Sequence, residues 1–302
     1  MENTKSVFAA IVGRPNVGKS SILNSILGQK VAIVSAKPQT TRTKIMGVLT
    51  RGETQIVFTD TPGLHSPKNK LGDFMVRSIA DSIGNVDICV LVADAGGKGV
   101  HKTELDLIEK FKTQDIPAIL VLNKIDTLKS KQALADKIAE YSELLRFEAV
   151  VPTSAVKGEG VESLTEEICK LAGEGPHFFP DDTLTDQPER VIAAEIIREK
   201  LLKLLSDEVP HGIAVDIEKM RERENNQSLM DIEATIYCER DSHKGIIIGK
   251  SGALLKRVGT YAREDIEAFL ECKVNLKLWV KVRDDWRNSE RSLKNFGFNE
   301  EH

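Results

Sequence analysis

The sequence predicts an α/β first part and a smaller α+β second part. Three observations support this. Over residues 1–172, apolar runs typical of strands recur between polar loops and helical patterns. One of these runs ends in a glycine-rich loop that opens a helix. Over residues 189–302, the patterns follow the order helix, strand, strand, helix, helix, strand, which is typical of a compact α+β domain.

Length and composition fit a globular protein of more than one domain. At 302 residues the chain exceeds one typical domain, and the length predicts about two. Hydrophobic residues make up 41% and charged residues 29%, an ordinary balance. The formal net charge is −4, yet basic side chains outnumber acidic ones between Arg240 and Lys294. A site for a polyanion is therefore expected late in the chain.

The cysteines and the apolar runs predict a cytosolic protein. The N-terminus lacks the apolar region of a signal peptide, and no run approaches the roughly 20 apolar residues that span a bilayer. The cysteines show no CxxC spacing, so we expect reduced thiols in a cytosolic protein. They are Cys89, Cys169, Cys238 and Cys272.

Residues 13–20 match the phosphate-binding loop, in which Gly, four residues, Gly, Lys and Ser occur in order. An apolar strand over residues 7–12 precedes them and a helical pattern over residues 21–27 follows, as the motif requires. Loop N–H groups and the helix start can surround a phosphate, Lys19 can bind the outer phosphates, and the Ser20 hydroxyl can ligate Mg²⁺. The predicted nucleotide-binding residues of the loop are Gly13, Asn16, Val17, Gly18, Lys19, Ser20 and Ser21.

Two loops further along the chain are predicted to complete a metal and phosphate site. In a nucleotide switch, one threonine reaches Mg²⁺ only while the γ-phosphate is present. Thr41 is the favoured ligand and Thr40 the next, both in a polar loop rich in hydroxyls. A later strand ends in Asp60, which can hold Mg²⁺, and Gly63 can donate its N–H to the γ-phosphate. Ser20, Thr41 and Asp60 form the predicted metal set, with Lys19, Asn16 and Gly63 beside it in hydrolysis.

A strand over residues 116–122 leads into a tetrapeptide that predicts guanine selection. The Asp126 carboxylate can accept both N1–H and the 2-amino group of guanine, which adenine cannot match. Discrimination against ATP can then reach about 10⁴-fold. We expect Asn123 to brace the loop and the Lys124 stem to lie along the purine ring. Further on, Ser154 precedes Ala155, whose N–H suits guanine O6.

Residues 173–188 contain several prolines and no periodicity, and they predict a linker between domains over residues 1–172 and 189–302. A phenylalanine pair in this stretch is expected to pin it to one domain. After the linker, the patterns predict a helix over 189–206, strands over 212–220, 229–239 and 274–282, and a terminal helix over 286–296.

A Gly-Lys-Ser-Gly turn separates a short apolar helix from a longer one in the second domain. Most such turns only join helices, but here the surrounding order is the sequence form of a KH domain. Its glycines let the backbone approach nucleic-acid phosphates, and the adjoining groove accommodates about four nucleotides. Trp279, in the last strand, is expected either to stack a base or to cover the terminal helix. The RNA-binding candidates are Gly249, Lys250, Ser251, Gly252, Lys256, Lys277 and Lys281.

The phosphate loop, the Thr-Thr-Arg run at residues 40–42 and the ending over residues 279–287 resemble the bacterial Era family, of the translation-factor class of GTPases. The likeness covers nearly the entire chain. It implies a doubly wound, mostly parallel P-loop GTPase sheet followed by an α+β type II KH domain. It also implies binding of GTP and GDP with Mg²⁺, and hydrolysis of GTP to GDP and phosphate.

The same resemblance bears on the rate of hydrolysis. Leu64 stands where Ras-like GTPases carry the glutamine that orients the attacking water, so basal hydrolysis is expected to be slow. In related GTPases the asparagine equivalent to Asn16 helps to hold a K⁺ that replaces an arginine finger. Asn16 fits that role or that of a loop brace, and the sequence leaves both open.

Partners follow from the resemblance rather than from the patterns. It implies small-subunit rRNA near its 3′ end, the small ribosomal subunit and a role in its assembly, with no DNA. A cytoplasmic, ribosome-associated monomer is expected, with weak peripheral association at the inner face of the cell membrane as a further implication. The competing readings are an RNA-binding module with a structural, non-hydrolysed nucleotide, an ATP-driven RNA remodelling enzyme, and a membrane-associated signalling GTPase.

Overall fold

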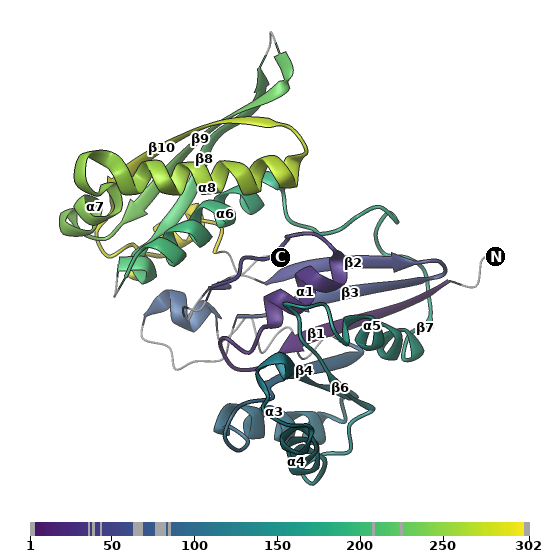
Figure 1. Ribbon diagram of the computed structural model, residues 1–302. Coiled ribbons are helices and arrows are strands. Elements are labelled where there is room, and N and C mark those ends of the chain that lie inside the picture. The colour runs from purple at the N-terminus through teal and green to yellow at the C-terminus, as the bar shows by residue number, and fades with distance from the viewer. Residues whose placement is uncertain are drawn as a thin grey trace. The chain divides into compact units, whose positions relative to one another are not determined.

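The structure, a computed structural model, describes residues 4–35, 37, 40–42, 44–62, 69–75, 83, 86–206, 209–223 and 226–298 (Figure 1). The chain divides into two compact units. The first unit comprises Met1–Val34, Thr41–Ser66 and Met75–Asp186, and the second comprises Ser35–Thr40, Pro67–Phe74 and Gln187–His302.

The first unit is built on a seven-stranded sheet with the order β2-β3-β1-β4-β5-β6, and β7 pairs with the start of β1. The pairs from β3 to β6 are parallel, whereas β2 and β7 run antiparallel to their partners. The predicted mostly parallel sheet is therefore confirmed. The strands are β1 (Lys5–Val12), β2 (Ile45–Arg51), β3 (Thr54–Asp60), β4 (Ile88–Asp94), β5 (Ala118–Asn123), β6 (Ala149–Pro152) and β7 (Gly173–Glu174).

Helices cover both faces of this sheet, which explains why its central strands are apolar almost throughout. Val7, Ala9 and Ile11 of β1 share one core with α1 and α5, while Ala10 and Val12 share the other with α3 and α4. Ligands of such doubly wound sheets bind at the carboxyl ends of the strands. The elements are α1 (Lys19–Leu27), α3 (Lys102–Gln114), η1 (Ile125–Thr127), α4 (Lys131–Ser142) and α5 (Val161–Lys170).

Residues 30–35 contain a short apolar run but form irregular chain rather than a strand. The Asn24 side chain of α1 supplies the hydrogen bonds: its Oδ1 accepts the N–H groups of Val31 (3.0 Å) and Ala32 (2.9 Å), and its Nδ2 donates to the Ala32 carbonyl (2.7 Å). One side chain thus replaces the neighbouring strand that a ladder would need.

The proline-containing stretch over residues 173–188 is tied to the first unit for much of its length. It begins with β7, and the buried Gln55 side chain then accepts hydrogen bonds from the Phe178 and Phe179 N–H groups at 2.7 and 3.0 Å. Gln55 Nε2 also donates to the Phe179 carbonyl at 2.9 Å. The Phe178 ring meets the ring of Phe8 edge-on at 4.9 Å. The Gln55 side chain and the Phe8–Phe178 ring contact are among the interactions that hold the stretch against the sheet.

The second unit has a three-stranded sheet with the order β10-β9-β8, in which β8 and β9 are antiparallel and β9 and β10 parallel. Apolar side chains of α6, α7 and α8 form one core with the inward residues of the three strands. The predicted element order is confirmed. The elements are α6 (Glu189–Leu204), η2 (Val209–Gly212), β8 (Ala214–Arg223), β9 (Asn226–Cys238), α7 (Asp241–Ile248), η3 (Lys250–Gly252), α8 (Ala253–Leu270) and β10 (Lys273–Val282).

The end of the chain is broken into two short helical pieces where one helix was predicted. These are η4 (Trp286–Asn288) and α9 (Glu290–Asn295). Ser289 interrupts the helix with an extended backbone, and its side chain accepts the Ser292 N–H, which caps α9. Trp286 is fully buried and donates through Nε1 to the Gly212 carbonyl at 2.9 Å. The tryptophan, rather than helix propensity, anchors this end.

Candidate nucleotide and RNA sites

The phosphate-binding loop packs too tightly for side chains at its two motif glycines. A Cβ on Gly13 would lie 2.3 Å from the Val92 carbonyl oxygen, and one on Gly18 would lie 2.2 Å from Asn123 Nδ2. Both glycines also have positive φ, of 146° and 103°, which favours glycine. The motif is therefore required by contacts with β4 and β5 as well as by any ligand.

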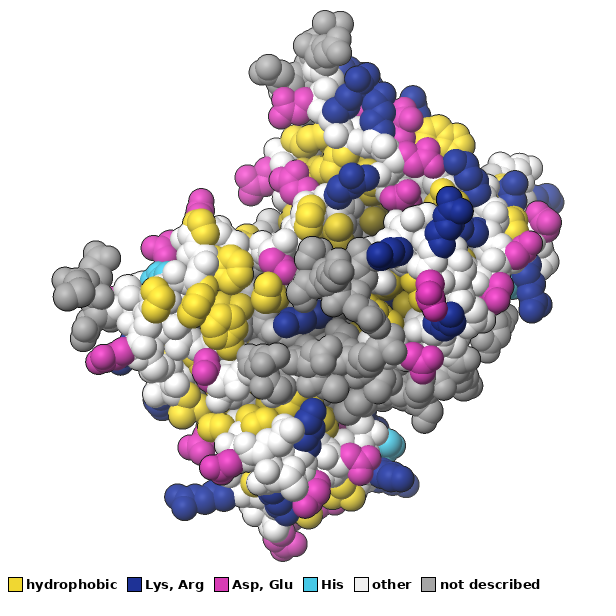
Figure 2. All heavy atoms as spheres, turned by 180° about the vertical axis from the view of Figure 1, so that it is seen from behind, with side chains coloured by type: hydrophobic (Ala, Val, Ile, Leu, Met, Phe, Trp, Pro, Cys, Tyr) yellow, Lys and Arg dark blue, Asp and Glu magenta, His cyan; other side chains and the backbone are white. Residues whose placement is uncertain are grey.

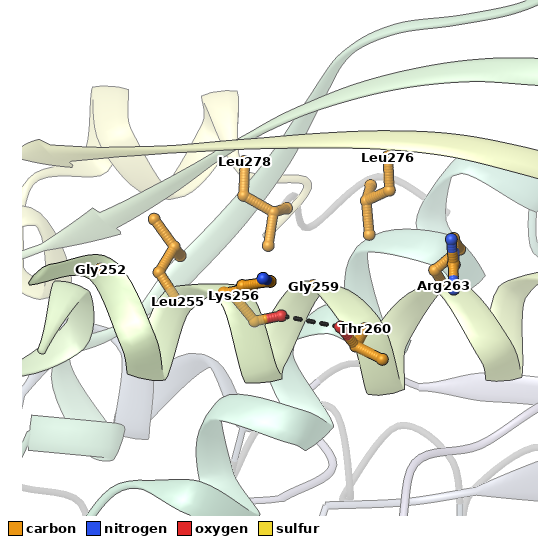
Figure 3. Close-up of a pocket in the computed structure, with 8 residues that line it drawn as sticks. All are labelled: Gly252, Leu255, Lys256, Gly259, Thr260, Arg263, Leu276 and Leu278. Carbon is orange, nitrogen blue, oxygen red and sulfur yellow. Dashed lines mark hydrogen bonds between the residues drawn. The ribbon is translucent and has the colours of Figure 1, made fainter.

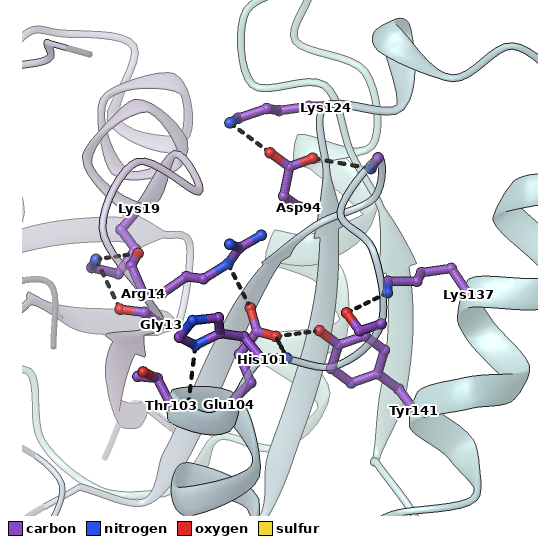
Figure 4. Close-up of polar contacts among 12 residues, drawn as sticks. Gly13, Arg14, Lys19, Asp94, His101, Thr103, Glu104, Lys124, Lys137 and Tyr141 are labelled. Atoms are coloured by element: carbon purple, nitrogen blue, oxygen red, sulfur yellow. Dashed lines mark hydrogen bonds and ion pairs between the residues drawn. The ribbon is translucent and has the colours of Figure 1, made fainter. Parts of the chain in front are cut away.

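Lys19 is buried at the start of α1 and turns back onto the loop. Its Nζ donates to the carbonyls of Gly13 (3.1 Å) and Arg14 (3.3 Å) (Figure 4). Burial lowers the pKa of Lys19 to about 8, and the attraction of Asp60 partly opposes that shift. A buried ammonium held by neutral carbonyls suits an incoming anion such as a polyphosphate.

The three predicted metal residues lie together. Ser20 Oγ donates to Asp60 Oδ2 at 2.6 Å and lies 3.0 Å from Thr41 Oγ1. The other carboxylate oxygen, Asp60 Oδ1, is buried and has no hydrogen-bond partner. Burial raises the pKa of Asp60 to about 6, against the attraction of Lys19. Two hydroxyls and an unpartnered carboxylate oxygen fit Mg²⁺, a hard cation that prefers oxygen ligands and keeps positions for phosphate and water.

The other residues predicted for the two loops beside the metal site do not join it in the described part of the chain. Thr40, the second candidate for the metal, bonds instead to the Lys37 carbonyl through Oγ1 at 2.6 Å. Only Thr41 reaches Ser20. Gly63, predicted to donate to the γ-phosphate, and Leu64 lie outside the described residues. Elsewhere in the described part of the chain, no cluster of three His, Cys, Asp or Glu side chains could hold a metal ion.

Asn123 joins the loops that were predicted to read guanine. Its Nδ2 donates to the Val17 carbonyl at 2.8 Å, and its Oδ1 accepts the Thr153 hydroxyl at 3.2 Å and the Ala155 N–H at 3.1 Å. The bracing role predicted for Asn123 thus has a geometric basis. The Ala155 N–H, predicted to donate to guanine O6, points at Asn123 here.

Asp126 and Lys124 are each held by one further side chain. Ser154 Oγ donates to Asp126 Oδ1 at 2.6 Å, so one carboxylate oxygen is fixed. The Lys124 ammonium lies 2.8 Å from Asp94 Oδ2, and Asp94 Oδ1 accepts the Gly96 N–H at 3.0 Å (Figure 4). Asp94 was not predicted. It ends β4 as Asp60 ends β3, and that shared position is the signal that could have revealed it.

A buried carboxylate supports the phosphate-binding loop from outside. Glu104 Oε1 accepts Arg14 Nε at 3.1 Å, and its Oε2 accepts the Tyr141 hydroxyl and the His101 N–H, both at 2.8 Å (Figure 4). Burial, followed by the charge of Glu104, raises the pKa of Tyr141 above its usual range. Arg14, whose carbonyl accepts a hydrogen bond from Lys19, is thus held through Glu104 to α3 and α4. No sequence motif points to this contact, because its partners are far apart in the chain.

The second unit has a groove of about 420 Å³ between α8 and β10 (Figure 3). Leu276 and Leu278 point from β10 toward α8, and Leu255 completes an apolar floor. Lys256 and Arg263 of α8 lie at its rim and are exposed. Apolar surface beside cations suits unstacked bases and their phosphates.

The Gly-Lys-Ser-Gly turn adjoins this groove. Gly249, Ser251 and Gly252 have φ values of 72°, 51° and 79°. A Cβ on Gly249 would lie 2.8 Å from Leu254 Cβ, so a side chain would push the turn off the start of α8. Lys250 and Ser251 are exposed, and Gly252 lines the groove itself. The structure therefore brings Gly249, Lys250, Ser251, Gly252 and Lys256 to one place.

Lys277 and Lys281 lie elsewhere. Side chains alternate along β10, so these lysines occupy the sheet face opposite Leu276 and Leu278. Lys277 pairs with Glu233 at 3.4 Å and Lys281 with Glu218 at 3.0 Å. The structure does not bring them to the groove. More widely, basic and acidic side chains are interspersed over the face drawn in Figure 2.

Trp279 shares the outer face of β10 and is 41% exposed. Trp286 and Tyr237, by contrast, pack against Phe296 in the terminal segment, at 5.2 and 5.1 Å between ring centroids. The contact with the terminal segment that was considered for Trp279 is thus made by other rings. A stacking role for Trp279 stays a prediction.

Known proteins resemble the chain over almost its whole length. GTPase Era of Clostridioides difficile (strain 630) is 52% identical over 98% of this chain and 99% of its own. A crystal structure of an Aquifex aeolicus Era variant bound to GDP.AlF4- has a TM-score of 0.93 at 39% identity, covering 98% of this chain and 99% of that one. An Era in complex with MgGDPNP and nucleotides 1506-1542 of 16S ribosomal RNA has a TM-score of 0.90 at 40% identity, with the same coverage.

Two family descriptions match the two units. The family described as 50S ribosome-binding GTPase matches residues 8–124, and the KH domain family matches residues 208–287. Fold and site together define a P-loop GTPase that carries a KH domain. Because relatives about half identical in sequence align with nearly all of it, the chain belongs to the Era family of GTPases.

Family membership removes two of the three competing readings. The protein is a GTPase, which sets aside the ATP-driven enzyme and the module whose nucleotide is never hydrolysed. The KH domain is confirmed as the second part of the chain. In the described ranges, no helix is both long and apolar enough to cross a membrane.

Proposed function

We propose that this GTPase is an RNA-binding switch that binds small-subunit rRNA near its 3′ end and acts in assembly of the small ribosomal subunit. One observation carries the proposal. The Era complex with MgGDPNP and nucleotides 1506-1542 of 16S ribosomal RNA corresponds to both units of this chain at 40% identity. In support, Ser20, Thr41 and Asp60 lie together in the first unit, and the second unit has an apolar groove with cations at its rim.

The residues proposed for the nucleotide site divide by the part of GTP that they bind. Residues 13–21 and Lys19 in particular surround the phosphates, and Ser20, Thr41 and Asp60 hold Mg²⁺. Bound Mg²⁺ supplies positive charge to the phosphoryl group that is transferred. Gly63 donates to the γ-phosphate. The guanine is bound by Asn123, Lys124, Asp126, Ser154 and Ala155. The nucleotide domain is proposed to span residues 1–172 and the RNA domain residues 189–302.

Coupling between the sites depends on the loops around Thr41 and Asp60. In the proposed cycle, GTP orders both loops through Mg²⁺ and the γ-phosphate, and this order changes how the RNA domain is held. Hydrolysis reverses the change. GTP can drive it only if the two arrangements bind the nucleotide with different affinity.

A monovalent cation is proposed to assist hydrolysis. Asn16 has a left-handed backbone, with φ 63°, at the outer turn of the phosphate-binding loop. In this proposal its side chain helps to hold K⁺ near the β- and γ-phosphates. Turnover should then be faster in K⁺ than in Na⁺ buffer for the wild type and equal in both for Asn16→Ala. Equal rates for the wild type would leave Asn16 with the bracing role alone.

RNA binding tests the proposal directly. The affinity for a fluorescent oligonucleotide of the 16S rRNA 3′ end is measured with GDPNP and with GDP. We expect tighter binding in one nucleotide state. Lys256→Glu, at the groove rim, should weaken binding at least tenfold, because it replaces a phosphate-facing cation with an anion. Lys277→Glu, on the opposite sheet face, is the matched control.

The outcomes separate the parts of the proposal. Equal affinity in both nucleotide states and for Gly249→Asp would remove the switch. A loss with Lys277→Glu or Lys281→Glu but none with Lys256→Glu would move the RNA to the outer sheet face. A preference for unrelated RNA would remove the assignment to the 16S 3′ end.

The setting of the protein is proposed on the same basis. We propose a cytoplasmic monomer that associates with the small ribosomal subunit and does not bind DNA. Weak peripheral association with the inner face of the cell membrane stays a prediction. Cosedimentation with ribosomal subunits and with anionic vesicles, each with and without GDPNP, measures both associations.

A further inference from the structure

Gly259 lies within α8, an 18-residue helix that spans Ala253–Leu270. Its φ is not positive, so the backbone there is one that any residue adopts. Glycine in the interior of a helix lowers stability relative to alanine, because it has more freedom to lose on folding. A glycine at this position therefore needs another reason.

Packing within the protein does not supply that reason. A Cβ at Gly259 would meet only Leu278 Cδ1, at 3.5 Å, which is ordinary van der Waals contact. Gly47 in β2 shows the opposite case, because a Cβ there would lie 2.7 Å from Leu23 Cδ1. A side chain is excluded at Gly47, whereas a methyl group at Gly259 would fit in contact with Leu278.

Gly259 lines the groove between α8 and β10. Figure 3 places Gly259 on α8 between Lys256 and Arg263, facing Leu278 of β10. Lys256 and Arg263 lie one helical turn to either side, on the same face of α8. Among the residues that line the groove, only Gly252 at the turn and Gly259 within α8 have no side chain.

We propose that Gly259 sets the depth of the groove, so that a nucleobase of single-stranded RNA lies directly against the α8 backbone. The base would rest on Leu276 and Leu278, and the phosphates on its two sides would meet Lys256 and Arg263. A methyl group at position 259 would lift the base away from the floor. This inference rests on the proposed RNA function and adds the residue that makes room for the base.

The proposal predicts that stability and RNA affinity change in opposite directions. Gly259→Ala should raise the melting temperature, through helix propensity, while RNA affinity falls roughly tenfold, as expected when one methyl overfills a fitted site. Gly259→Leu should reduce RNA affinity further, because a larger side chain fills more of the groove. Gly245→Ala is the matched control, since Gly245 is an exposed helical glycine of α7 with no atom within 4 Å of a Cβ.

The experiment combines thermal melting with titration of the 16S 3′-end oligonucleotide into each GDPNP-bound variant. GTP turnover without RNA should stay at the wild-type rate, which shows that the first unit is intact. We expect higher melting temperatures for Gly259→Ala and Gly245→Ala, and weaker RNA binding only for the Gly259 variants.

Three results would overturn the inference. Gly259→Ala could bind RNA as tightly as the wild type, it could melt below the wild type, or Gly245→Ala could weaken RNA binding equally. If Gly259→Leu folds poorly, the alanine variant alone decides. If the wild type bound no RNA, the proposed function itself would be refuted. The two failures can be told apart, because this one is seen with the wild type alone and the others require the variants.

Discussion

Gly18 in the nucleotide loop and Gly259 in the groove of the second unit are both glycines, but the room for a side chain differs between them. The position of a Cβ on Gly18 is taken by the amide of Asn123, 2.2 Å away. The nearest atom to a Cβ on Gly259 is 3.5 Å away, across the groove. The nucleotide loop thus has no room for a side chain at Gly18, whereas a methyl group at Gly259 would fit between α8 and Leu278.

The two regions also differ in how they hold charge. Lys19 and Asp60 are buried, and burial moves the pKa of each toward neutrality, to about 8 and about 6. Lys256 and Arg263 are exposed beside leucines. Buried groups respond strongly to a charged ligand in contact with them, whereas exposed cations act through attraction that salt screens. The comparison predicts that single substitutions reduce ligand affinity more in the nucleotide site than in the RNA groove.

The largest expected effect comes from Asp126→Asn. The carboxylate is predicted to accept two hydrogen bonds from guanine. A hydrogen bond to a charged acceptor contributes about 1.5–3 kcal/mol to the free energy of binding. GTP affinity should therefore fall roughly 10²–10⁴-fold, measured by calorimetry with GTP and ATP. Asp136→Asn is the control, since Asp136 is exposed on α4 and bonds only to Gln132 in the contacts described. Equal affinity of the wild type for GTP and ATP would contradict the assigned role.

Gly18→Ala directly tests the tight packing at Gly18 on which the comparison with Gly259 depends. The added methyl collides with Asn123, so the loop must shift at a cost of about 1–3 kcal/mol, and GTP affinity should fall roughly 10- to 100-fold. Gly52→Ala is the control because Gly52 also has a positive φ, of 56°, but a Cβ there meets nothing within 4 Å. If both variants bind GTP like the wild type, the loop is not packed as described.

The smallest effect expected is a dependence on pH. Mg²⁺ needs the ionised Asp60 carboxylate, whose pKa is raised to about 6 by burial. The affinity for MgGDPNP should be level above pH 7 and fall about tenfold per pH unit below 6. Without nucleotide the sign reverses for stability. The folded state binds this proton more tightly than the unfolded chain, so the contribution of Asp60 is lost as pH rises from 3.8 to about 6.

A control and a contrary result frame that measurement. Asp60→Asn should remove the step near pH 6 together with most of the Mg²⁺ dependence of binding. RNA affinity measured without nucleotide in the same pH series should show no such step, because Asp60 is not among the residues that line the groove. A wild-type affinity for MgGDPNP that does not change between pH 7 and pH 5 would contradict the predicted ligand.

Motifs of adjacent residues could be predicted from the sequence, since their function depends on local backbone geometry. Residues 13–20 and 123–126 follow apolar strands, and parallel strands deliver their carboxyl ends to one edge of the sheet. Contacts between distant segments could not be predicted. No sequence motif marks the ion pairs of Arg14 with Glu104 and of Lys124 with Asp94, because many other carboxylates in the chain would satisfy the same local rules.

Chain order alone therefore indicated the class of fold, the phosphate-binding loop, the tetrapeptide predicted to read guanine and the KH arrangement, because each is a pattern of neighbours. Only the tertiary structure decided which threonine hydroxyl meets Ser20, that Lys277 and Lys281 turn away from the groove, and that Gly259 lines it opposite Leu278. The physical reason is packing. Which side chains share a volume depends on how sheets and helices stack, and that information is spread over the whole chain.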